Sequence, residues 1–160
     1  PTVKELLKES GFPGMKVLQF GFEAWPHDPF YPHNFKTTNC ICYTGTHDNE
    51  TIIGWLDSIS KEEKMMAREY MCDYKTAQKN LHWSMICMIM RSRANLTMIP
   101  MQDYLGLDNK ARLNQPSTVG KNWKWRVKEE QFSEELKLQI RKLTKMYGRI
   151  NWQWDDKLDA

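Results

Sequence analysis

The sequence predicts an α/β fold with parallel strands, and three observations support this prediction. Short apolar runs typical of buried strands occur at residues 15–20, 40–43 and 96–99. Longer segments with apolar residues at helical spacing lie between these runs. No hairpin turn signal joins one run to the next, so each connection is expected to be a crossover, and crossovers link parallel strands.

The N-terminal third predicts a short helix, a strand and a long loop. Thr2 and Glu5 form a capping box, and apolar residues at helical spacing continue the pattern to about residue 10. The sequence GFPG at residues 11–14 ends this helix and precedes the first strand. Residues 21–38 are rich in proline, histidine and aromatic residues without periodicity. A loop of this length is expected to be functional or mobile.

The rest of the chain predicts further helices around the other two strands. A helical pattern begins at Glu50, and Ser60 with Glu63 caps another helix that runs to about Cys72. Polar residues 73–79 interrupt the helical pattern, which resumes over 81–91, and residues 104–126 read as a loop. The last amphipathic helix is expected over residues 132–147, with a stripe made of Phe132, Leu136, Ile140 and Leu143. Residues 151–160 are expected to form a frayed tail.

Composition excludes two classes of partner. The 23 basic residues are dispersed and matched by 20 acidic ones, which leaves a net charge of +3 and no footprint for nucleic acid. The longest apolar run, residues 85–90, is far short of a membrane span of roughly 20 residues, and no signal peptide is recognised. A chain of 160 residues fits one domain. We therefore expect no nucleic acid and no membrane partner.

Cysteine usage favours a reducing compartment. Cysteines stand at positions 40, 42, 72 and 87 without a CxxC pair. Cys40 and Cys42 lie two residues apart on a predicted strand, so they face the same side and cannot easily bridge to each other. All four lie among apolar neighbours in the sequence. Free, buried thiols in a cytoplasmic protein are the expected state.

The segment that organises the chain is residues 43–55, which read YTGTHDNETIIGW. His47, Asp48 and Asn49 follow the second strand directly and precede a helix. Parallel α/β enzymes bind their substrates at such strand ends. An alternative is that Asp48 or Asn49 only caps the next helix, as these residue types commonly do.

Five collinear motifs resemble the amylomaltases, the 4-α-glucanotransferases of glycoside hydrolase family 77. These motifs are GFPGMKVLQF at residues 11–20, PHN at 32–34, YTGTHDN at 43–49, IPMQD at 99–103, and ARLN at 111–114 followed by GKNWKWR at 120–126. The resemblance runs from about Gly11 to Arg126. It implies a (β/α)8 barrel in which the three strands are the sixth to the eighth. Residues 1–160 would then be a single segment, the C-terminal portion of a TIM-barrel catalytic domain.

The resemblance also implies roles for four residues. Asp48 matches the family's third catalytic acid, which hydrogen-bonds the 2- and 3-hydroxyls of the reacting sugar. His47 matches a histidine that binds the same sugar, and Asn114 matches a sugar-binding asparagine. Phe20 matches an aromatic residue of the acceptor region, although a phenylalanine at a strand end can equally belong to the core. The nucleophile and the acid/base carboxylates of a retaining mechanism have no match here and would lie before Pro1.

The implied reaction transfers a segment of an α-1,4-glucan to the 4-hydroxyl of another glucan or of glucose. Its partners are α-1,4-glucans such as maltooligosaccharides, glycogen or starch dextrins, together with the rest of the barrel. No cofactor and no metal are implied, because carboxylates alone carry the chemistry. Two alternatives stay open. One is a non-catalytic carbohydrate-binding module, and the other is a hydrolase of the α-amylase clan, against which the long match over residues 99–126 argues.

Several other polar residues have competing interpretations. Gln102 and Asp103 could reach a cleft, but we expect Asp103 to cap the turn that follows it. The cluster of Trp123, Trp125 and Arg126 could bind single-stranded nucleic acid, but the family match favours packing. The spacing of three further residues fits no standard metal site: His27, Asp28 and His33.

The sequence departs from the family's usual residues at four positions. Glu50 replaces an aspartate, Phe35 a tyrosine, Leu113 a methionine, and Ser117 a glycine. The last change affects loop geometry, because a position that prefers glycine can require a positive φ.

Overall fold

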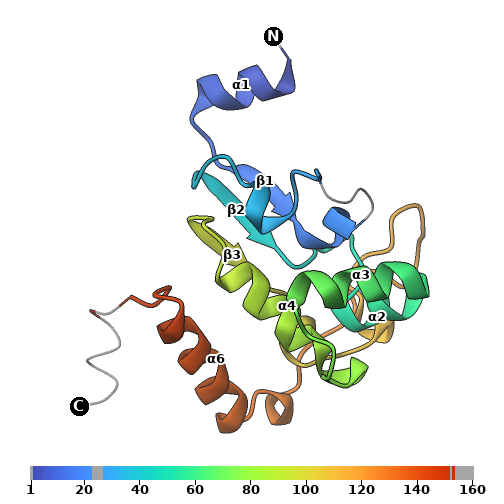
Figure 1. The fold of residues 1–160 in the computed structure, drawn as a ribbon. Coiled ribbons are helices and arrows are strands. Elements are labelled where there is room, and N and C mark those ends of the chain that lie inside the picture. The colour runs from blue at the N-terminus through green and yellow to red at the C-terminus, as the bar shows by residue number, and fades with distance from the viewer. Residues whose placement is uncertain (1, 23–26, 152, 154–160) are drawn as a thin grey trace. The chain divides into compact units, whose positions relative to one another are not determined.

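The computed structural model describes residues 2–22, 27–151 and 153, and the chain forms two units, residues 1–125 and 126–160. The first unit is built on a three-stranded sheet with the order β1 (Gly14–Val17), β2 (Cys40–Tyr43) and β3 (Leu96–Met98). Both pairings are parallel, which confirms the predicted fold class. Figure 1 shows the three strands side by side, with helices covering one side of them.

The register of the sheet brings three loops to one edge. Val17 pairs with Tyr43, and Tyr43 pairs with Met98, so the strands end level with one another. The segments that follow them therefore leave the sheet at the same edge. This edge is where polar side chains were expected to gather.

The two faces of the sheet differ in burial. Cys40 and Cys42 of the central strand are at most 1% exposed, whereas Ile41 and Tyr43, which alternate with them, are only partly buried. On the same face as Ile41, its register partners Met15 and Leu96 are 58% and 48% exposed. A parallel sheet is normally covered on both faces. Here the described residues leave most of this apolar face uncovered, and only Val17 on it is fully buried.

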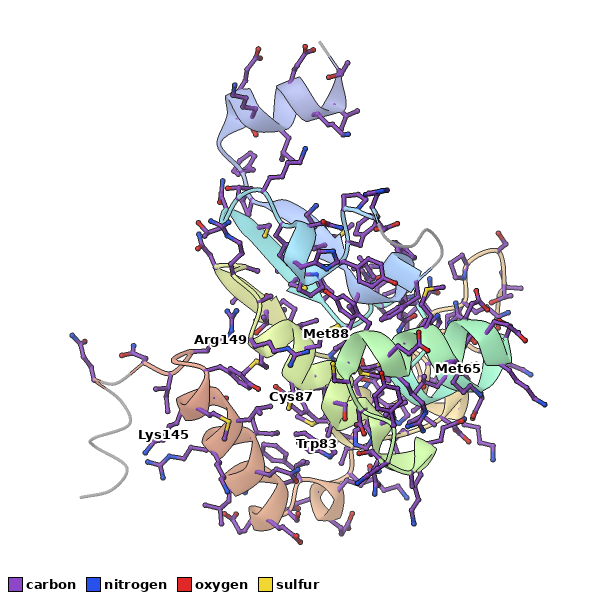
Figure 2. The ribbon with its side chains drawn as sticks, in the orientation of Figure 1. Met65, Trp83, Cys87, Met88, Lys145 and Arg149 are labelled. Atoms are coloured by element: carbon purple, nitrogen blue, oxygen red, sulfur yellow. The ribbon has the colours of Figure 1, made fainter. Side chains whose placement is uncertain are left out.

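Three helices provide the core of the first unit: α2 (Ile52–Ser58), α3 (Lys61–Met71) and α4 (Leu81–Met90). α4 is apolar almost all round, and most of its residues are buried, as expected for a helix enclosed by its neighbours. Met88 of α4 is 1% exposed, whereas Met65 of α3 is 58% exposed; both residues are labelled in Figure 2. This unit also contains other short elements, including η2 (Pro32–Asn34), η3 (Gln78–Asn80), α5 (Met101–Tyr104) and η4 (Asn109–Ala111).

The predicted capping boxes are confirmed. The side chain of Thr2 accepts from the amide of Glu5 at the start of α1 (Val3–Ser10), and Glu5 returns the bond to the Thr2 amide. Ser60 and Glu63 make the same reciprocal pair at the start of α3. In both places the capping box satisfies backbone N–H groups that lack an intrahelical partner.

The first strand is shorter than predicted. Residues 15–20 were expected to be extended throughout, but the chain leaves the sheet after Val17 and forms the 3-10 helix η1 (Leu18–Phe22). A short apolar run cannot distinguish this case, because Leu18 is buried in the 3-10 turn just as it would be in a strand. Phe20 consequently lies on η1 and not at a strand end.

The described part of the long loop, residues 27–38, is anchored by aromatic side chains. Tyr31 and Phe35 are at most 3% exposed. The ring of Tyr31 lies 5.2 Å from that of Phe22 and 4.5 Å from that of Tyr70 on α3. The loop has no periodicity because single aromatic anchors hold it against the core.

The cysteines are free, as predicted, but not all of them are buried. Cys40 and Cys42 are buried on the sheet, Cys87 is partly buried, and Cys72 is exposed. Cys72 ends α3 in the left-handed region, with φ 55°. Its apolar neighbours belong to the helix, whereas the residue itself lies at the turn where the chain leaves that helix.

The second unit contains η5 (Glu129–Gln131) and α6 (Glu134–Met146). Ser133 caps α6 by accepting from the amide of Leu136, so the helix begins two residues later than predicted. Phe132 lies outside the helix and is 42% exposed, whereas Leu136 and Leu143 of the predicted stripe are buried. The tail expected over 151–160 lies almost entirely outside the described residues. Among the described helices, none has the length and apolar character that a membrane crossing requires.

Candidate functional site

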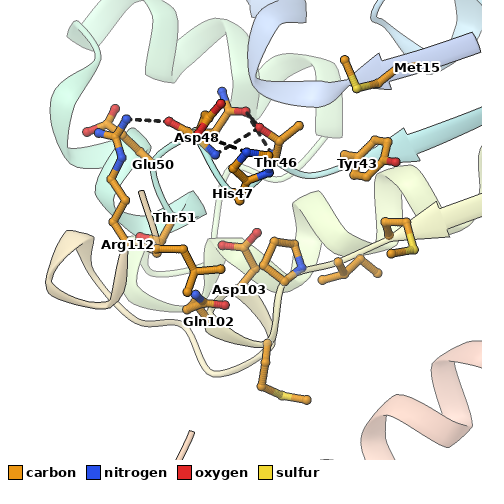
Figure 3. Close-up of a pocket in the computed structure, with 17 residues that line it drawn as sticks. Met15, Tyr43, Thr46, His47, Asp48, Glu50, Thr51, Gln102, Asp103 and Arg112 are labelled. Atoms are coloured by element: carbon orange, nitrogen blue, oxygen red, sulfur yellow. Dashed lines mark hydrogen bonds and ion pairs between the residues drawn. The ribbon is translucent and has the colours of Figure 1, made fainter. Parts of the chain in front are cut away.

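A pocket of about 550 Å³ opens at the edge where the strands end. Figure 3 shows that its walls come from the two loops that follow β2 and β3, with Met15 and Tyr43 contributed by the sheet. The polar side chains that line it are Thr46, His47, Asp48, Asn49, Glu50, Thr51, Gln102, Asp103 and Arg112. The pocket therefore lies at the carboxyl ends of the strands, where the site was predicted.

The loop after β2 is folded by its own side chains. Asn49 Oδ1 accepts from the Thr46 amide at 2.9 Å and from Thr46 Oγ1 at 2.7 Å, and this closes a turn around residues 47 and 48. Thr51, whose side chain accepts from the amide of Gly54, caps α2. The alternative that Asp48 or Asn49 is the helix cap is therefore wrong, and Asp48 is available for another role.

Asp48 projects from this turn toward the second loop. Its Oδ1 accepts from Asn114 Nδ2 at 2.6 Å and lies 3.2 Å from His47 Nε2. The side chain is 46% exposed, and no described residue donates a hydrogen bond to the other oxygen, Oδ2. One carboxylate oxygen is thus held by the protein while the second is left to accept a bond from a bound molecule.

The loop after β3 fixes Asp48 through its backbone as well. Arg112 Nη2 donates to the Asp48 carbonyl at 2.6 Å, and Arg112 Nε donates to the Asn114 carbonyl at 3.0 Å. The Asn114 amide donates to the His47 carbonyl at 3.1 Å. Arg112 was not predicted as a site residue. It stands in the ARLN motif two residues before Asn114, and that proximity was the available signal.

His47 has an aromatic neighbour. Its ring lies 5.2 Å from that of Trp123, with an angle of 35° between the planes, and the His47 side chain is 53% exposed. Trp123 adopts φ 65°, a conformation unfavourable for a large residue, and its amide donates to the Leu113 carbonyl at 2.7 Å. Trp123, which we had expected to serve packing, therefore lies beside the site residue His47.

The predicted site residues fall into two groups. His47, Asp48 and Asn114 come together in direct contact, although Asn114 does not line the pocket. Phe20 is 39% exposed on η1, where its ring packs edge-on against Phe30 at 5.5 Å, and it is not among the lining residues. The structure thus assembles three of the four residues and leaves Phe20 apart.

Asp103 is placed differently from our expectation. It lies within α5, is 2% exposed, and accepts from Thr44 Oγ1 at 2.6 Å and from the amide of Ile52 at 2.8 Å. Burial raises the pKa of Asp103 to about 6. It therefore caps the start of α2 across the pocket floor and not the turn that follows it. Its neighbour Gln102 donates to the Ala111 carbonyl, which keeps the second loop compact.

Two of the departures from the family's usual residues are accommodated locally. Glu50 accepts from Asn109 Nδ2 at 2.6 Å and from Ser58 Oγ at 2.9 Å, so the longer side chain has partners on both sides. Ser117 adopts φ 63°, which confirms the expectation that this position requires the left-handed region.

Two of the three residues considered for a metal have other partners. His33 Nδ1 lies 2.8 Å from the hydroxyl of Tyr70, and Asp28 Oδ1 accepts from the amide of Phe30 at 2.7 Å. Within residues 2–22 and 27–151, no group of three or more histidine, cysteine, aspartate or glutamate side chains could hold an ion. The pocket therefore offers hydrogen bonding by the Asp48 carboxylate and the His47 imidazole, on a loop that the Arg112 guanidinium holds in place.

The chain is similar to known proteins over most of its length. Residues 1–132 match the family model Glyco_hydro_77, described as 4-alpha-glucanotransferase. The 4-alpha-glucanotransferase of Clostridium butyricum is 46% identical over 147 residues, which are 91% of this chain and 29% of that protein. The chloroplastic/amyloplastic 4-alpha-glucanotransferase of Arabidopsis thaliana is 41% identical over 151 residues, or 92% of this chain and 26% of that protein.

A solved structure resembles the fold as well. The amylomaltase from Streptococcus agalactiae in complex with acarbose superposes with a TM-score of 0.87 at 36% identity, over 92% of this chain and 30% of that chain. The chain thus spans less than a third of the length of the curated relatives and of the solved structure that it matches.

Proposed function

The chain belongs to the 4-alpha-glucanotransferase family of glycoside hydrolase family 77, and from this premise we propose that it supplies one wall of a transferase active site. The reaction moves a segment of an α-1,4-glucan to the 4-hydroxyl of another glucan or of glucose, through a covalent intermediate. The observation that carries the proposal is the half-exposed Asp48 carboxylate, held on one oxygen by Asn114 and His47 and open to the pocket on the other.

Each site residue has a role that its contacts support. Asp48 accepts hydrogen bonds from the 2- and 3-hydroxyls of the reacting sugar, and these bonds strengthen as the ring distorts toward the transition state. His47 binds the same sugar, and Asn114, the predicted sugar-binding asparagine, holds the Asp48 carboxylate in place through its amide nitrogen. Phe20 contributes to a more distant acceptor region. The nucleophile and the acid/base belong to parts of the enzyme that this chain does not supply, and no cofactor takes part.

The sheet supports a place within a larger barrel. We assign β1, β2 and β3 to the sixth, seventh and eighth strands of a (β/α)8 barrel. The open apolar face, which carries Met15, Ile41, Tyr43, Leu96 and Met98, then becomes the barrel interior, where side chains from alternate strands pack in layers. Polar residues at the strand ends take the position of a barrel active site. Residues 1–160 form the C-terminal portion of that catalytic domain.

The cellular compartment of this protein is predicted from its cysteines and not from its family. We retain a cytoplasmic location as a prediction, based on the free thiols. The Arabidopsis relative is chloroplastic/amyloplastic, so membership of the family alone does not fix the compartment.

A hybrid enzyme tests the proposed function. In the hybrid, this chain replaces the 147-residue segment that it matches in the Clostridium butyricum 4-alpha-glucanotransferase. We expect the hybrid to convert maltotriose into glucose and longer maltooligosaccharides. We expect the isolated chain to do neither, because it contributes one catalytic carboxylate and retaining transfer needs a nucleophile and an acid/base besides. The products are separated and quantified by chromatography.

Three outcomes would contradict the proposal. A folded hybrid that binds acarbose but forms no products would favour a carbohydrate-binding role. A hybrid that releases glucose without longer products would favour a hydrolase. Glucose release by the isolated chain, in proportion to the amount of purified protein, would show that its own residues complete the chemistry.

A further inference from the structure

A single buried carboxylate holds both ends of the loop that carries the site. Asp103 accepts from Thr44 Oγ1 at 2.6 Å and from the Ile52 amide at 2.8 Å. Thr44 is the first residue after β2, and Ile52 is the first residue of α2. The intervening residues 45–51 include His47 and Asp48, so the two bonds fix the points from which that loop departs and to which it returns.

These bonds are protected from water. Thr44 and Ile52 are 0% exposed, and Asp103 is 2% exposed on the floor of the pocket (Figure 3). A hydrogen bond to an ionised carboxylate is stronger and shorter than one between neutral groups, and in a buried place no solvent competes for it. An apolar side chain of the same size would avoid the cost of burying a charge, but it could accept neither bond.

Other contacts brace the same loop between Thr44 and Ile52. Asn109 Oδ1 accepts from the Thr51 amide at 3.3 Å, Arg112 binds the Asp48 carbonyl, and Gln19 Nε2 donates to the Glu50 carbonyl at 2.8 Å. These contacts are part-buried. Asp103 is therefore the buried anchor of a loop whose remaining braces are reached by solvent.

We propose that Asp103 is a positioning residue for the glucanotransferase reaction: Thr44 and Ile52 engage both of its carboxylate oxygens, and it sets the place of Asp48 and His47 by anchoring the loop at these two residues. This inference rests on the proposed function. A displacement of about 1 Å in a catalytic group can lower the rate by about a hundredfold, so the loss of a buried anchor is expected to reach the reaction.

The raised pKa of the buried Asp103 leads to a separate prediction about the pH dependence of stability. Its folded pKa of about 6 lies above the unfolded value of about 3.9, so the folded hybrid retains a proton that the unfolded chain has lost. The stability contributed by this proton is present below pH 4 and lost as pH rises to about 6. The Asp103→Asn variant lacks this component, so its unfolding midpoint should rise relative to the parent between pH 4.5 and pH 7. A constant difference would show that the pKa of Asp103 is not raised in the folded state and would contradict this pH prediction.

Three nearly isosteric substitutions in the hybrid test the positioning role. Asp103→Asn keeps an oxygen for the Ile52 amide and an amide group that can donate to Thr44 Oγ1, so we expect kcat within about threefold of the parent. Asp103→Leu removes both bonds, and we expect kcat for maltotriose disproportionation to fall about a hundredfold while KM changes less than about threefold. Thr44→Val, which removes one bond, should give an intermediate loss of about tenfold. Rates are expressed per folded molecule, from a thermal melt of each variant.

Hydrogen–deuterium exchange of the hybrid without substrate provides a readout that does not depend on activity. In Asp103→Leu, and to a smaller extent in Thr44→Val, the amides of residues 46–52 should exchange at least tenfold faster, while those of α4 stay protected. An inactive parent hybrid would reject the proposed function, and the exchange experiment would still decide whether Asp103 anchors the loop. Asp103→Leu with a kcat within threefold of the parent per folded molecule, or with unchanged loop exchange, would overturn the positioning role.

Discussion

Asp48→Asn in the hybrid enzyme is expected to lower kcat for maltotriose disproportionation by about 10²–10³-fold while changing KM by much less. The asparagine keeps an oxygen that can accept from Asn114, so the turn at residues 46–49 should survive. The open carboxylate oxygen is replaced by an amide or a neutral carbonyl. The charge-assisted bonds to the sugar hydroxyls, which matter most in the transition state, are then lost. A loss of this size is typical when one transition-state contact is removed.

A matched substitution controls for the change of charge. Asp57→Asn alters an exposed aspartate near the C-terminal end of α2, the end farther from the site loop. The hydrogen-bond partner of Asp57 is Gln78. We expect its kcat to stay within about twofold of the parent. Steady-state kinetics of both variants decide the matter. A kcat for Asp48→Asn within a few-fold of the parent would mean that Asp48 only shapes the turn and that the proposed role is wrong.

The fold was largely predictable because its signals are local. Capping boxes at Thr2 and Ser60 mark helix starts through contacts three residues apart, and these starts are correct. The first strand was predicted too long, because the turn into η1 depends on how Leu18 and Phe22 fit the core. That fit involves residues distant in the sequence, such as Tyr31 and Trp55, and no local pattern encodes it.

The site was predictable only in part, for the same reason. The motif at residues 43–49 indicated Asp48 and His47, and the structure places them at the predicted strand end. The bonds that hold them come from residues more than fifty positions further along the chain, namely Asp103, Asn109, Arg112 and Asn114. A carboxylate can cap the turn beside it or a helix far away, and its sequence neighbours do not distinguish the two. Asp103 was therefore assigned to the wrong partner.

The isolated chain is expected to self-associate or aggregate in solution. Among the described strands, β1 and β3 each pair on one side only, so each leaves an open edge. Residues on these strands are apolar and accessible, with Met15, Leu96 and Met98 at 58%, 48% and 47% exposure. Charged side chains or prolines usually block such edges, and Lys16 is the one such residue within β1 and β3. An open apolar face beside unpaired edges favours pairing with a second copy.

Two methionines of equal exposure distinguish association through the open sheet face from nonspecific hydrophobic association. Met15 on β1 and Met65 on α3 are both 58% exposed, but only Met15 lies on the open face of the sheet. Size-exclusion chromatography should show the parent chain and Met65→Lys eluting as species larger than a monomer. Met15→Lys should shift the population toward smaller species, because a lysine at an edge opposes pairing and burial of that face.

A parent chain that elutes as a monodisperse monomer and melts in one sharp cooperative transition would show that these three strands fold alone. The open face would then be a stable surface and would no longer support its assignment to the interior of a larger barrel.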